Sequence, residues 1–405
     1  MRPAQPWNTL RQVQNTKQWH KLVNPSLQRH TRPTSSLPRP YRFHVGASWA
    51  GKPVNPRDRQ VNTKPFPKDH PVAVWRDHVL SRPNGTNGRH IGEDFFYIQE
   101  MRSQSGLSLG IADGVGGWID SGVDPSLFSQ SLMYHAHRYA KNGWVGEPEI
   151  DPTQDYTERE EVEGWELTPM ECMELAHGGV LRERAVVAGS STACIVNLNA
   201  STGILRAANL GDSGFAIIRS SSIIHFQQPQ THYFNCPKQL TKIPRNTRLH
   251  GGMCMDPASD ADTYETKLID GDIVILFTDG LSDNVFPTEL TSICSLVSRQ
   301  YAHSPPPLPP ADATKHAFKF IHTEEDAQAQ TIAERFVNYA QLCMKNKKRA
   351  SPFERAAARE GMYFRGGVSI LPSDCTDESR ILTTILAFQK MDDVTVIVAM
   401  VRETL

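Results

Sequence analysis

Three apolar, β-branched stretches of strand length each adjoin an acidic residue, and this pairing is the main pattern of the chain. The stretches and their carboxylates are Leu107–Ala112 with Asp113, Ile273–Phe277 with Asp279, and Val394–Ala399 with Asp392 and Asp393. Apolar runs of this length predict buried strands. A carboxylate at the tip of a buried strand is costly unless a cation lies beside it. The pattern therefore predicts strands that end at a charged site.

Helices are predicted where capping residues open a new segment. Asp124 offers an N-cap and is followed by a proline, which predicts a helix over Pro125–Lys141. Thr168–Glu171 is a capping-box pattern that opens a second helix, ending at about Arg184. Ser351–Glu354 repeats this pattern and predicts a short helix.

The order of these elements favours one fold class. Thr192–Arg219 alternates apolar and polar positions around a turn, which predicts a β-meander. Ser304–Pro310 is rich in proline and predicts an exposed polyproline segment. Strands and helices follow one another without a regular βαβ alternation. This favours a layered α+β architecture over a doubly wound parallel sheet.

Composition limits the class of protein. The chain has 405 residues, 39% of them hydrophobic, which is enough for a substantial core. Residues 1–57 contain ten Lys or Arg and no Asp or Glu, so the remainder carries 33 basic against 44 acidic groups. An acidic body argues against a nucleic-acid surface, which needs a basic face. No run of about 18 apolar residues occurs, so no membrane span is predicted.

The basic segment 1–57 is predicted to be a mitochondrial transit peptide, with delivery to the matrix. It is rich in Arg, Ser, Thr and Gln and lacks an apolar stretch of signal-peptide length. The alternative interpretation is a disordered basic tail. Residues 58–88, punctuated by proline and glycine, are predicted to be a lead-in to the main domain.

The acidic clusters have almost no His or Cys near them in sequence. The seven cysteines are dispersed without a C-x-x-C pair, which predicts reduced, packed thiols instead of a disulfide scaffold or a zinc site. If the three strands are neighbours, their carboxylates converge at one edge of a sheet. Oxygen ligands alone select hard divalent cations, here Mg²⁺ or Mn²⁺.

Six motifs occur in a fixed order along the chain. They are G-E-D-F at 92–95, A-D-G-V-G-G-W at 112–118, A-G-S-S-T at 188–192, N-L-G-D-S-G-F at 209–215, F-T-D-G-L-S-D-N at 277–284 and D-D-V-T-V-I-V-A at 392–399. The series resembles the metal-dependent (PPM, type 2C) serine/threonine protein phosphatases, over roughly residues 89–401. G-V-D-P at 122–125 and S-P-F-E-R-A-A at 351–357 resemble the mitochondrial branch of that family.

The resemblance implies both a fold and an activity. The fold is an α+β four-layer α/β/β/α sandwich with two central antiparallel sheets and a metal site at one end. The domain would span 89–402, with a proline-rich insertion at 303–330 and a second insertion at 368–389. The activity is hydrolysis of phosphoserine and phosphothreonine on mitochondrial proteins by a water activated by two Mg²⁺ or Mn²⁺ ions. Enzymes of ubiquinone synthesis are among the implied substrates, and the chain is expected to be a monomer.

The resemblance also assigns metal ligands by motif position. Asp113 would be the carboxylate that bridges the two metals. The Gly114 carbonyl and Glu93 would bind one of these metals, and Asp279 and Asp392 would bind the other. Asp113 and Asp279 are the more secure pair, because each closes an apolar strand within a matching motif.

Three further residues have roles implied by the resemblance. Asp94 would hold a metal-bound water from outside the ligand shell. Arg89, at the start of an R-x-x-x-E-D spacing, would bind phosphate with its planar guanidinium; a surface arginine is the alternative. Asp283 would be a ligand of an accessory third metal. Against that role, Val186–Ala188 lacks the acid that often completes the accessory site.

The chain departs from the family pattern at one position. Many relatives read D-G-H-G-G, with the histidine a candidate general acid for the leaving group, but this chain has Val115 there. Leaving-group protonation must then come from water or another residue. His90 and His232 are the nearest candidates in sequence, and an ordinary loop histidine is the alternative for each.

Two other function classes are considered. Gly211–Gly214 reads G-D-S-G, as in chymotrypsin-like proteases, but no histidine lies in a matching context upstream, and Asp212 is interpreted as a turn residue. The second alternative is an inactive or weak family member that binds phosphoproteins as a regulator. The presence of Asp113, Asp279 and Asp392 favours the enzyme.

Residues 368–389 carry a separate hypothesis, namely that they are translated intron. Their removal would join Gly367 to Lys390 and restore a short turn before Asp392. Val368-Ser369 and Phe388-Gln389 are compatible with splice donor and acceptor codons. A genuine surface insertion is the alternative, because loops tolerate insertions at small entropic cost.

Overall fold

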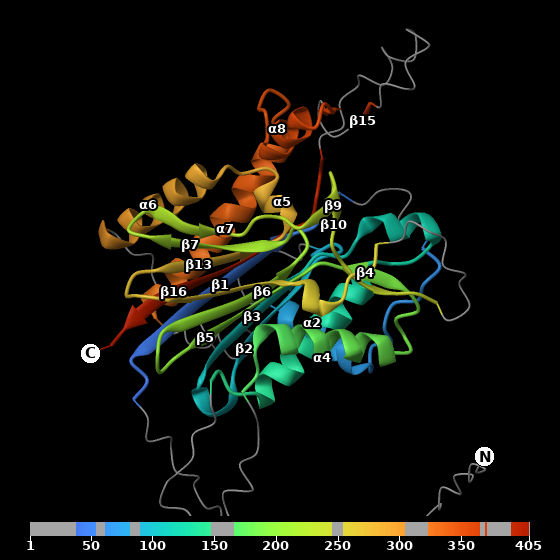
Figure 1. Ribbon diagram of the computed structural model, residues 1–405. Helices are drawn as coiled ribbons and strands as arrows, with labels where there is room; N and C mark the ends of the chain where they lie inside the picture. The colour runs from blue at the N-terminus through green and yellow to red at the C-terminus, as the bar shows by residue number, and fades with distance from the viewer. Residues whose placement is uncertain are drawn as a thin grey trace, which may run out of the picture. The chain divides into compact units, whose positions relative to one another are not determined.

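The computed structural model describes residues 38–53, 61–81, 90–146, 166–244, 254–303, 323–364, 369–370 and 390–404. These belong to the compact unit Leu37–Leu405; a separate unit, Met1–Ser36, lies outside the described residues. Within the larger unit two five-stranded antiparallel sheets lie against each other, with helices on their outer faces (Figure 1). The predicted four-layer α+β architecture is confirmed.

The first sheet has the strand order β1-β16-β13-β7-β8. Its strands are β1 (Tyr41–Ala50), β16 (Val394–Glu403), β13 (Ile273–Phe277), β7 (Gly214–Arg219) and β8 (Ser222–Phe226). In β16, Val394 lies opposite Ala50 of β1 and Val396 lies opposite Phe277 of β13. The first eight residues of β16 are all buried, because helices cover one face of this sheet and the second sheet covers the other.

The second sheet has the strand order β12-β6-β5-β3-β2. Its strands are β12 (Asp262–Lys267), β6 (Ile204–Leu210), β5 (Ala193–Asn199), β3 (Gly106–Ala112) and β2 (Phe95–Glu100). β3 is buried along its whole length, as its apolar sequence predicts. Edge strand β12 is largely exposed and carries Asp262, Glu265 and Lys267, charges that discourage pairing with another chain.

Three short strand pairs lie outside the two sheets. They are β4 (Gly189–Ser191) with β11 (Leu240–Lys242), β9 (Thr231–Tyr233) with β10 (Cys236–Pro237), and β14 (Tyr363–Phe364) with β15 (Ser369–Ile370). The first pair matters for function, because β4 runs beside the turn that follows β3 and forms an isolated bridge from Ser191 to Gly114.

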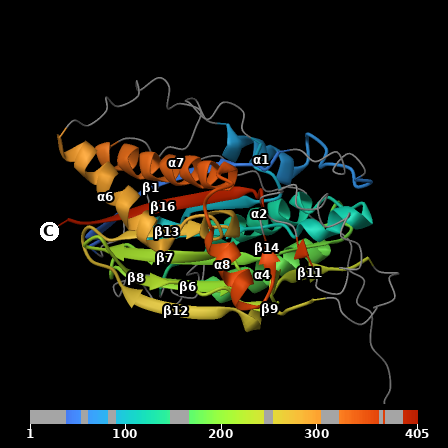
Figure 2. The same cartoon turned by 90° about the horizontal axis from the view of Figure 1, so that it is seen from above.

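Helices form the two outer layers. They are α1 (Pro71–Leu80), α2 (Ser126–Asn142) and α4 (Pro169–Arg182) on the side of the second sheet, α6 (Pro287–His303) and α7 (Glu324–Lys345) on the side of the first, and the short α5 (Asp279–Ser282) and α8 (Pro352–Arg359). Figure 2 shows α7 lying along β1 and β16. None of the helices within the described residues has the length and apolar composition that spanning a bilayer requires.

Two of the three predicted helix starts are confirmed, and the third is shifted by one residue. Thr168 and Glu171 form a capping box at α4, and Ser351 and Glu354 form one at α8. α2 begins at Ser126, so Pro125 and not the predicted Asp124 is the N-cap residue, although Asp124 Oδ1 accepts from the Ser126 N–H at 3.0 Å. A capping box at Thr323 also opens α7, which the sequence analysis did not predict. In each box the side-chain oxygens satisfy backbone donors that a helix start otherwise leaves unpaired.

The core has two parts. The larger lies between the sheets and under α2 and α4, and it includes Trp49 of β1, whose ring centre is 5.3 Å from that of Phe96 in β2. The smaller lies between the first sheet and α6 and α7, and it includes Phe277 and Phe336. Each sheet therefore buries both of its faces, which explains why the central strands read as unbroken apolar runs.

The predicted boundary of the basic leader at residue 57 is wrong. β1 lies inside that segment and pairs with β16 over ten residues, from Tyr41 opposite Glu403 to Ala50 opposite Val394. α7 packs on β1 so closely that a Cβ on Gly46 would lie 2.3 Å from the backbone of Gln330. Residues 1–57 lack acids, as a leader would, but Tyr41–Ala50 also contains the apolar positions of a largely buried strand.

Other predicted segments also differ from the structure. β5 and β6 form the expected hairpin, but β7 belongs to the first sheet, so Thr192–Arg219 is a crossover between sheets and not one meander. α1 lies within the lead-in 58–88, so the domain begins before residue 89. Of the insertion 303–330, residues 304–322 lie outside the described residues and α7 begins at Glu324. Of 368–389, only Ser369–Ile370 is described, as strand β15.

The described cysteines are free thiols, namely Cys172, Cys194, Cys236, Cys254, Cys294 and Cys343. Cys236 and Cys254 have Sγ atoms 3.3 Å apart. Cys375 lies outside the described residues.

Candidate metal centre

Carboxylates from both sheets meet at one end of the molecule's central layers. Asp113 follows β3, Asp279 follows β13, and Asp212 lies in the crossover turn between β6 and β7. Ligand oxygens of these three residues all lie within 4.8 Å of one another. Like charges this close repel strongly where water is scarce, so the group requires a cation or protons.

The turn that carries Asp113 is held by its neighbour, the segment Gly189–Thr192. The backbone N–H of Asp113 donates to Thr192 Oγ1 at 3.1 Å, and its carbonyl accepts from Ser191 Oγ at 2.7 Å. The next residue, Gly114, donates to the Glu93 carbonyl at 3.2 Å. A Cβ on Gly114 would lie 2.8 Å from that carbonyl oxygen, so only glycine allows this approach.

Glu93 is fixed from two sides. Its side-chain Oε2 accepts a 2.8 Å hydrogen bond from Lys52 Nζ. Its backbone N–H donates to Asp393 Oδ2 at 2.7 Å, and the backbone N–H of Lys52 donates to Asp393 Oδ1 at the same distance. Burial alone would lower the pKa of Lys52, but the charges of Asp392, Asp393 and Glu93 outweigh it and raise that pKa. Lys52 is therefore a permanent cation at this corner of the site.

Asp94 is fully buried behind Glu93. Its Oδ2 accepts a 2.9 Å hydrogen bond from Thr278 Oγ1, while its Oδ1 has no hydrogen-bond partner. Burial, followed by the charge of Asp393, raises the pKa of Asp94 well above its ordinary value. Asp94 is thus poised to accept a further donor or a cation.

Lys390 lies among the carboxylates on the other side. Its Nζ is 2.8 Å from Asp279 Oδ2 and 3.4 Å from Asp392 Oδ2, and it also binds Asp283. Burial would lower the pKa of Lys390, but the three carboxylates outweigh it and raise that pKa well above its ordinary value. The ammonium is therefore charged at every physiological pH.

Lys52 and Lys390 give the carboxylates of the site different pKa values. Burial and the charge of Asp279 raise the pKa of Asp113 well above its ordinary value, and they raise the pKa of Asp392 to about 7. Burial would also raise the pKa of Asp279, but the charge and hydrogen bond of Lys390 lower it below the ordinary value. A divalent cation arriving at this site would displace protons from Asp113 and Asp392.

The residues fit a hard divalent metal. Asp279 Oδ1 and Asp94 Oδ1 are buried oxygens without a hydrogen-bond partner in the protein. The cluster that brings Asp113, Asp212 and Asp279 together contains carboxylates only, with no sulfur or imidazole. Such a donor set suits Mg²⁺ or Mn²⁺ and disfavours zinc.

The structure brings most of the predicted site residues together. Glu93, Asp94, Asp113, Gly114, Asp279 and Asp392 all surround this corner. Arg89 lies outside the described residues. His90 and His232 have local partners, since His90 Nδ1 accepts from Gly92 N–H at 2.9 Å and His232 Nε2 lies 3.0 Å from Asp256 Oδ2.

Three residues of the site were not predicted. Asp212 was interpreted as a turn residue; it does lie in a turn, but one that crosses between the sheets at the metal centre. Lys52 falls within the predicted leader, and no site role is predicted for Lys390, although the two lysines pair with Glu93 and Asp392. The available signal for Asp212 was its position after an apolar strand, the same context that identified Asp113 and Asp279.

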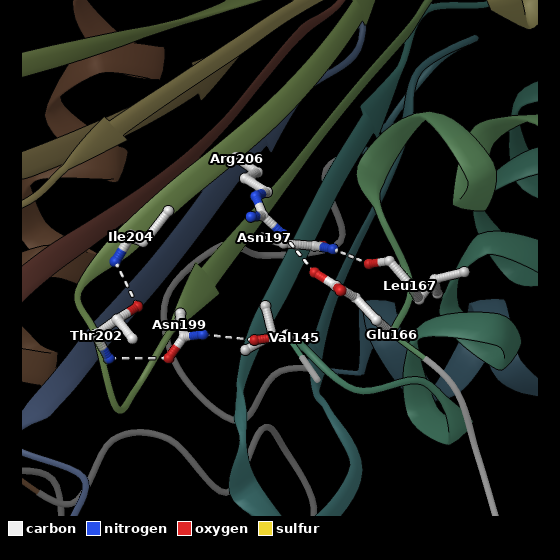
Figure 3. Close-up of a pocket in the computed structure, with 9 residues that line it drawn as sticks. Val145, Glu166, Leu167, Asn197, Asn199, Thr202, Ile204 and Arg206 are labelled. Carbon is white, nitrogen blue, oxygen red and sulfur yellow. Dashed lines mark hydrogen bonds and ion pairs between the residues drawn. The ribbon is translucent and has the colours of Figure 1, made fainter. Parts of the chain in front are cut away.

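A cavity of about 260 Å³ lies at the opposite end of the second sheet (Figure 3). Arg206 and Glu166 form an ion pair across it, and Asn197 and Asn199 donate to the Leu167 and Val145 carbonyls at 2.8 and 2.6 Å. These contacts tie the ends of β5 and β6 to the segments before and after residues 147–165. The cavity shares no residue with the metal centre.

Comparison with known proteins identifies relatives of the chain. It is 32% identical over 291 residues to the protein phosphatase PTC7 homologue of Danio rerio, covering 71% of this chain and 80% of that protein. It is 36% identical over 214 residues to the PTC7 homologue fig of Drosophila willistoni, and 36% identical over 200 residues to the human PTC7 homologue. The chain spans 61% and 58% of the lengths of these last two. No family model matches the chain.

A solved structure shares the fold. The photosystem II phosphatase PBCP superposes with a TM-score of 0.52 at 22% sequence identity, covering 89% of this chain and 98% of that one. At this identity the likeness concerns the fold alone. The relative from Danio rerio is similar over most of its own length, and the carboxylates required by the shared motifs converge in space. The chain belongs to the PPM family of metal-dependent serine/threonine protein phosphatases.

Proposed function

We propose that this protein hydrolyses phosphoserine and phosphothreonine in proteins and requires Mg²⁺ or Mn²⁺ to do so. The observation that carries the proposal is the convergence of Asp113, Asp212 and Asp279, whose oxygens lie within 4.8 Å of one another although they come from both sheets. The family supplies the reaction type, and the all-oxygen donor set supplies the metal class.

The metal ligands are proposed from the motifs together with the observed contacts. Asp113 would bridge two ions, with Glu93 and the Gly114 carbonyl on one and Asp279 and Asp392 on the other. When bound, the ions supply an acidified water and neutralise charge on the phosphoryl oxygens. No covalent nucleophile is proposed, because in the one C-x5-R match, Cys343–Arg349, burial raises the pKa of the thiol and the arginine is paired with Glu289.

The protein's own residues orient this chemistry. Lys52 donates to Glu93 and fixes its Oε2, while Thr278 donates to one oxygen of Asp94, whose other oxygen has no hydrogen-bond partner. A Cβ on Gly116 would lie 3.7 Å from Lys52 Nζ, so this cation borders the loop in which Val115 replaces a histidine. A positive charge there would attract the phosphate group.

Turnover distinguishes the enzyme from a phosphoprotein-binding regulator. The full chain should release phosphate from a phosphothreonine peptide with Mn²⁺ or Mg²⁺ added, and Asp113→Asn should not. Equal activity in excess chelator would contradict metal dependence. Peptide binding without phosphate release under any metal condition would favour the regulator.

Delivery to the mitochondrial matrix is proposed from the acid-free basic segment at the N-terminus. Substrates would then be matrix phosphoproteins, with enzymes of ubiquinone synthesis as the first group to examine. A reporter carrying residues 1–37 should enter mitochondria, and a cytosolic reporter would contradict the targeting proposal. Phosphoproteomics of mitochondria with and without the active protein would identify the substrates.

A further inference from the structure

Lys390 is held by four groups, two of them from α5 and the residue after it, one from two positions further along its own segment, and one from α8. Three are carboxylates: Asp279 and Asp392, 2.8 and 3.4 Å from its Nζ, and Asp283, which also binds it. The fourth is the ring of Phe353, whose centre lies 4.6 Å from Nζ. An ammonium enclosed by three carboxylates and an aromatic face is an integral part of the site.

Phe353 is held beside Lys390 by the helix that carries it. Phe353 is in the first turn of α8, which a capping box opens, and it is 8% exposed. Its backbone N–H donates to the Asp283 carbonyl at 3.1 Å, which fastens α8 to the turn that carries the carboxylate. A cation over an aromatic face is stabilised by the ring's negative charge density, more strongly when water is excluded. The S-P-F-E-R-A-A motif therefore has a structural purpose at the centre.

Asp283 has two competing interpretations. As an accessory ligand it would share a third metal with Asp279; Val186–Ala188 offers no further acid, but Asp212, with an oxygen within 4.8 Å of Asp279, could complete that site. In the structure the ammonium of Lys390 already bonds to both Asp283 and Asp279. A divalent ion and an ammonium cannot occupy the same position, because their charges repel at short range. Asp279 still leaves its buried Oδ1 without a partner for a metal.

We propose that Lys390 is a resident cation that fills the accessory position of the centre. The site then takes two divalent ions, not three, and Asp283 serves as the partner of a lysine instead of a metal ligand. The inference rests on the proposed function only in requiring that the centre binds metal. Lys390 is a positioning residue here, since it neutralises Asp283 and holds Asp279 in place.

Counting bound metal tests this without reference to turnover. The full chain and three variants, Asp283→Asn, Lys390→Met and the double variant, would be dialysed to equilibrium against increasing Mn²⁺ and the bound metal measured. We expect two ions for the wild type and for Asp283→Asn, because neither has a vacant accessory position. Lys390→Met should bind three, because Asp283 and Asp279 lose their cation, and the double variant should return to two. Methionine keeps the length of lysine without its charge.

Each other outcome overturns the proposal. Three ions in the wild type, or one ion lost on Asp283→Asn, would make Asp283 a metal ligand. Tighter binding in Lys390→Met without a third ion would show that the lysine competes at one of the two shared positions. If Lys390→Met does not fold, as judged by its melting curve with Mn²⁺, the wild type and Asp283→Asn still decide. Failure to release phosphate would count against the proposed function and leave the metal count unaffected.

Discussion

The carboxylate of Asp393 accepts a 2.7 Å hydrogen bond from the backbone N–H of Glu93, across 300 positions of the chain. Its other oxygen accepts from the backbone N–H of Lys52, also at 2.7 Å. One buried aspartate just before β16 therefore fixes the loops that carry Glu93, a proposed metal ligand, and the cation of Lys52. Asp393 thus organises the centre through both of its carboxylate oxygens, while the metal ligand proposed on this strand is its neighbour Asp392.

Gly92 permits this arrangement and provides the first prediction. Its φ is +78°, and a Cβ there would lie 1.9 Å from Asp393 Oδ1. Gly92→Ala should cost about 1–3 kcal/mol for the backbone conformation and more for displacing Asp393. Chemical denaturation in chelator would measure the loss, and weaker Mn²⁺ binding should accompany it.

Gly271→Ala is the matched control. Gly271 has a similar φ of +82°, but nothing lies within 4 Å of the position its Cβ would take. Gly271→Ala should lose only the free energy of unfolding that the backbone conformation costs, and it should leave Mn²⁺ binding unchanged. Equal losses in the two variants would mean that the Asp393 contact does not constrain Gly92.

The second prediction separates two ligands that the family pattern treats alike. Asp113→Asn and Asp279→Asn should both abolish phosphate release. In chelator, however, Asp113→Asn should stabilise the fold by about 1 kcal/mol, because burial and then the charge of Asp279 raise the pKa of Asp113 and disfavour its carboxylate there. Asp279→Asn should destabilise it by about 1–3 kcal/mol, because Lys390 loses a buried partner.

Melting temperatures in chelator and phosphate release with Mn²⁺ would be measured on the same samples. Stabilisation by both substitutions would show that Lys390 contributes nothing to the charge balance around Asp279. Near wild-type phosphate release by either variant would instead refute the ligand assignment.

The sequence predicted the parts of the fold whose signals are local. Capping boxes at Thr168 and Ser351 identified helix starts, because the cap uses residues within one turn. The strands before Asp113 and Asp279 are mainly apolar and are buried throughout, since both faces of each sheet are covered. The ordered motifs then placed these carboxylates at one site, and the structure confirms that they meet.

The parts that were missed depend on pairing between distant segments. Nothing near β1 in sequence states that it pairs with β16, about 350 residues away. Asp212 reaches the centre because the chain changes sheets between β6 and β7, a topological event without a local pattern. Lys52 lies near the end of the segment predicted to be a basic leader, and Lys390 directly follows the predicted insertion. Their ion pairs with Glu93 and Asp279 therefore have no local signal in the sequence.

The third prediction concerns the N-terminal boundary. Removal of residues 1–37 should leave the melting temperature and Mn²⁺ binding of the protein essentially unchanged, because β1 begins at Tyr41. Removal of residues 1–57 should prevent folding, because it deletes an edge strand that covers β16 and α7 and also removes Lys52. Soluble expression and circular dichroism would compare the two truncations. A folded, metal-binding protein lacking residues 1–57 would contradict the role assigned to β1.

The last prediction concerns pH and lies away from the metal centre. His137 on α2 stacks on Trp75, with ring centres 5.2 Å apart, and burial followed by the charges of Lys141 and Arg138 lowers its pKa to about 4. Unfolded histidine has a pKa of about 6.5, so below that pH His137 binds a proton in the unfolded chain but stays neutral in the folded chain. The stability contributed by neutral His137 is thus complete above pH 6.5 and is lost as pH falls from about 6.5 towards 4.

His137→Phe keeps the stacking and cannot titrate, so it should gain on the order of 1–2 kcal/mol relative to wild type between pH 7 and pH 5. Denaturation in chelator at both pH values would measure this difference, with His303→Gln at an exposed position as the control. A wild-type-minus-variant difference that stays constant with pH would show that His137 titrates normally in the folded protein.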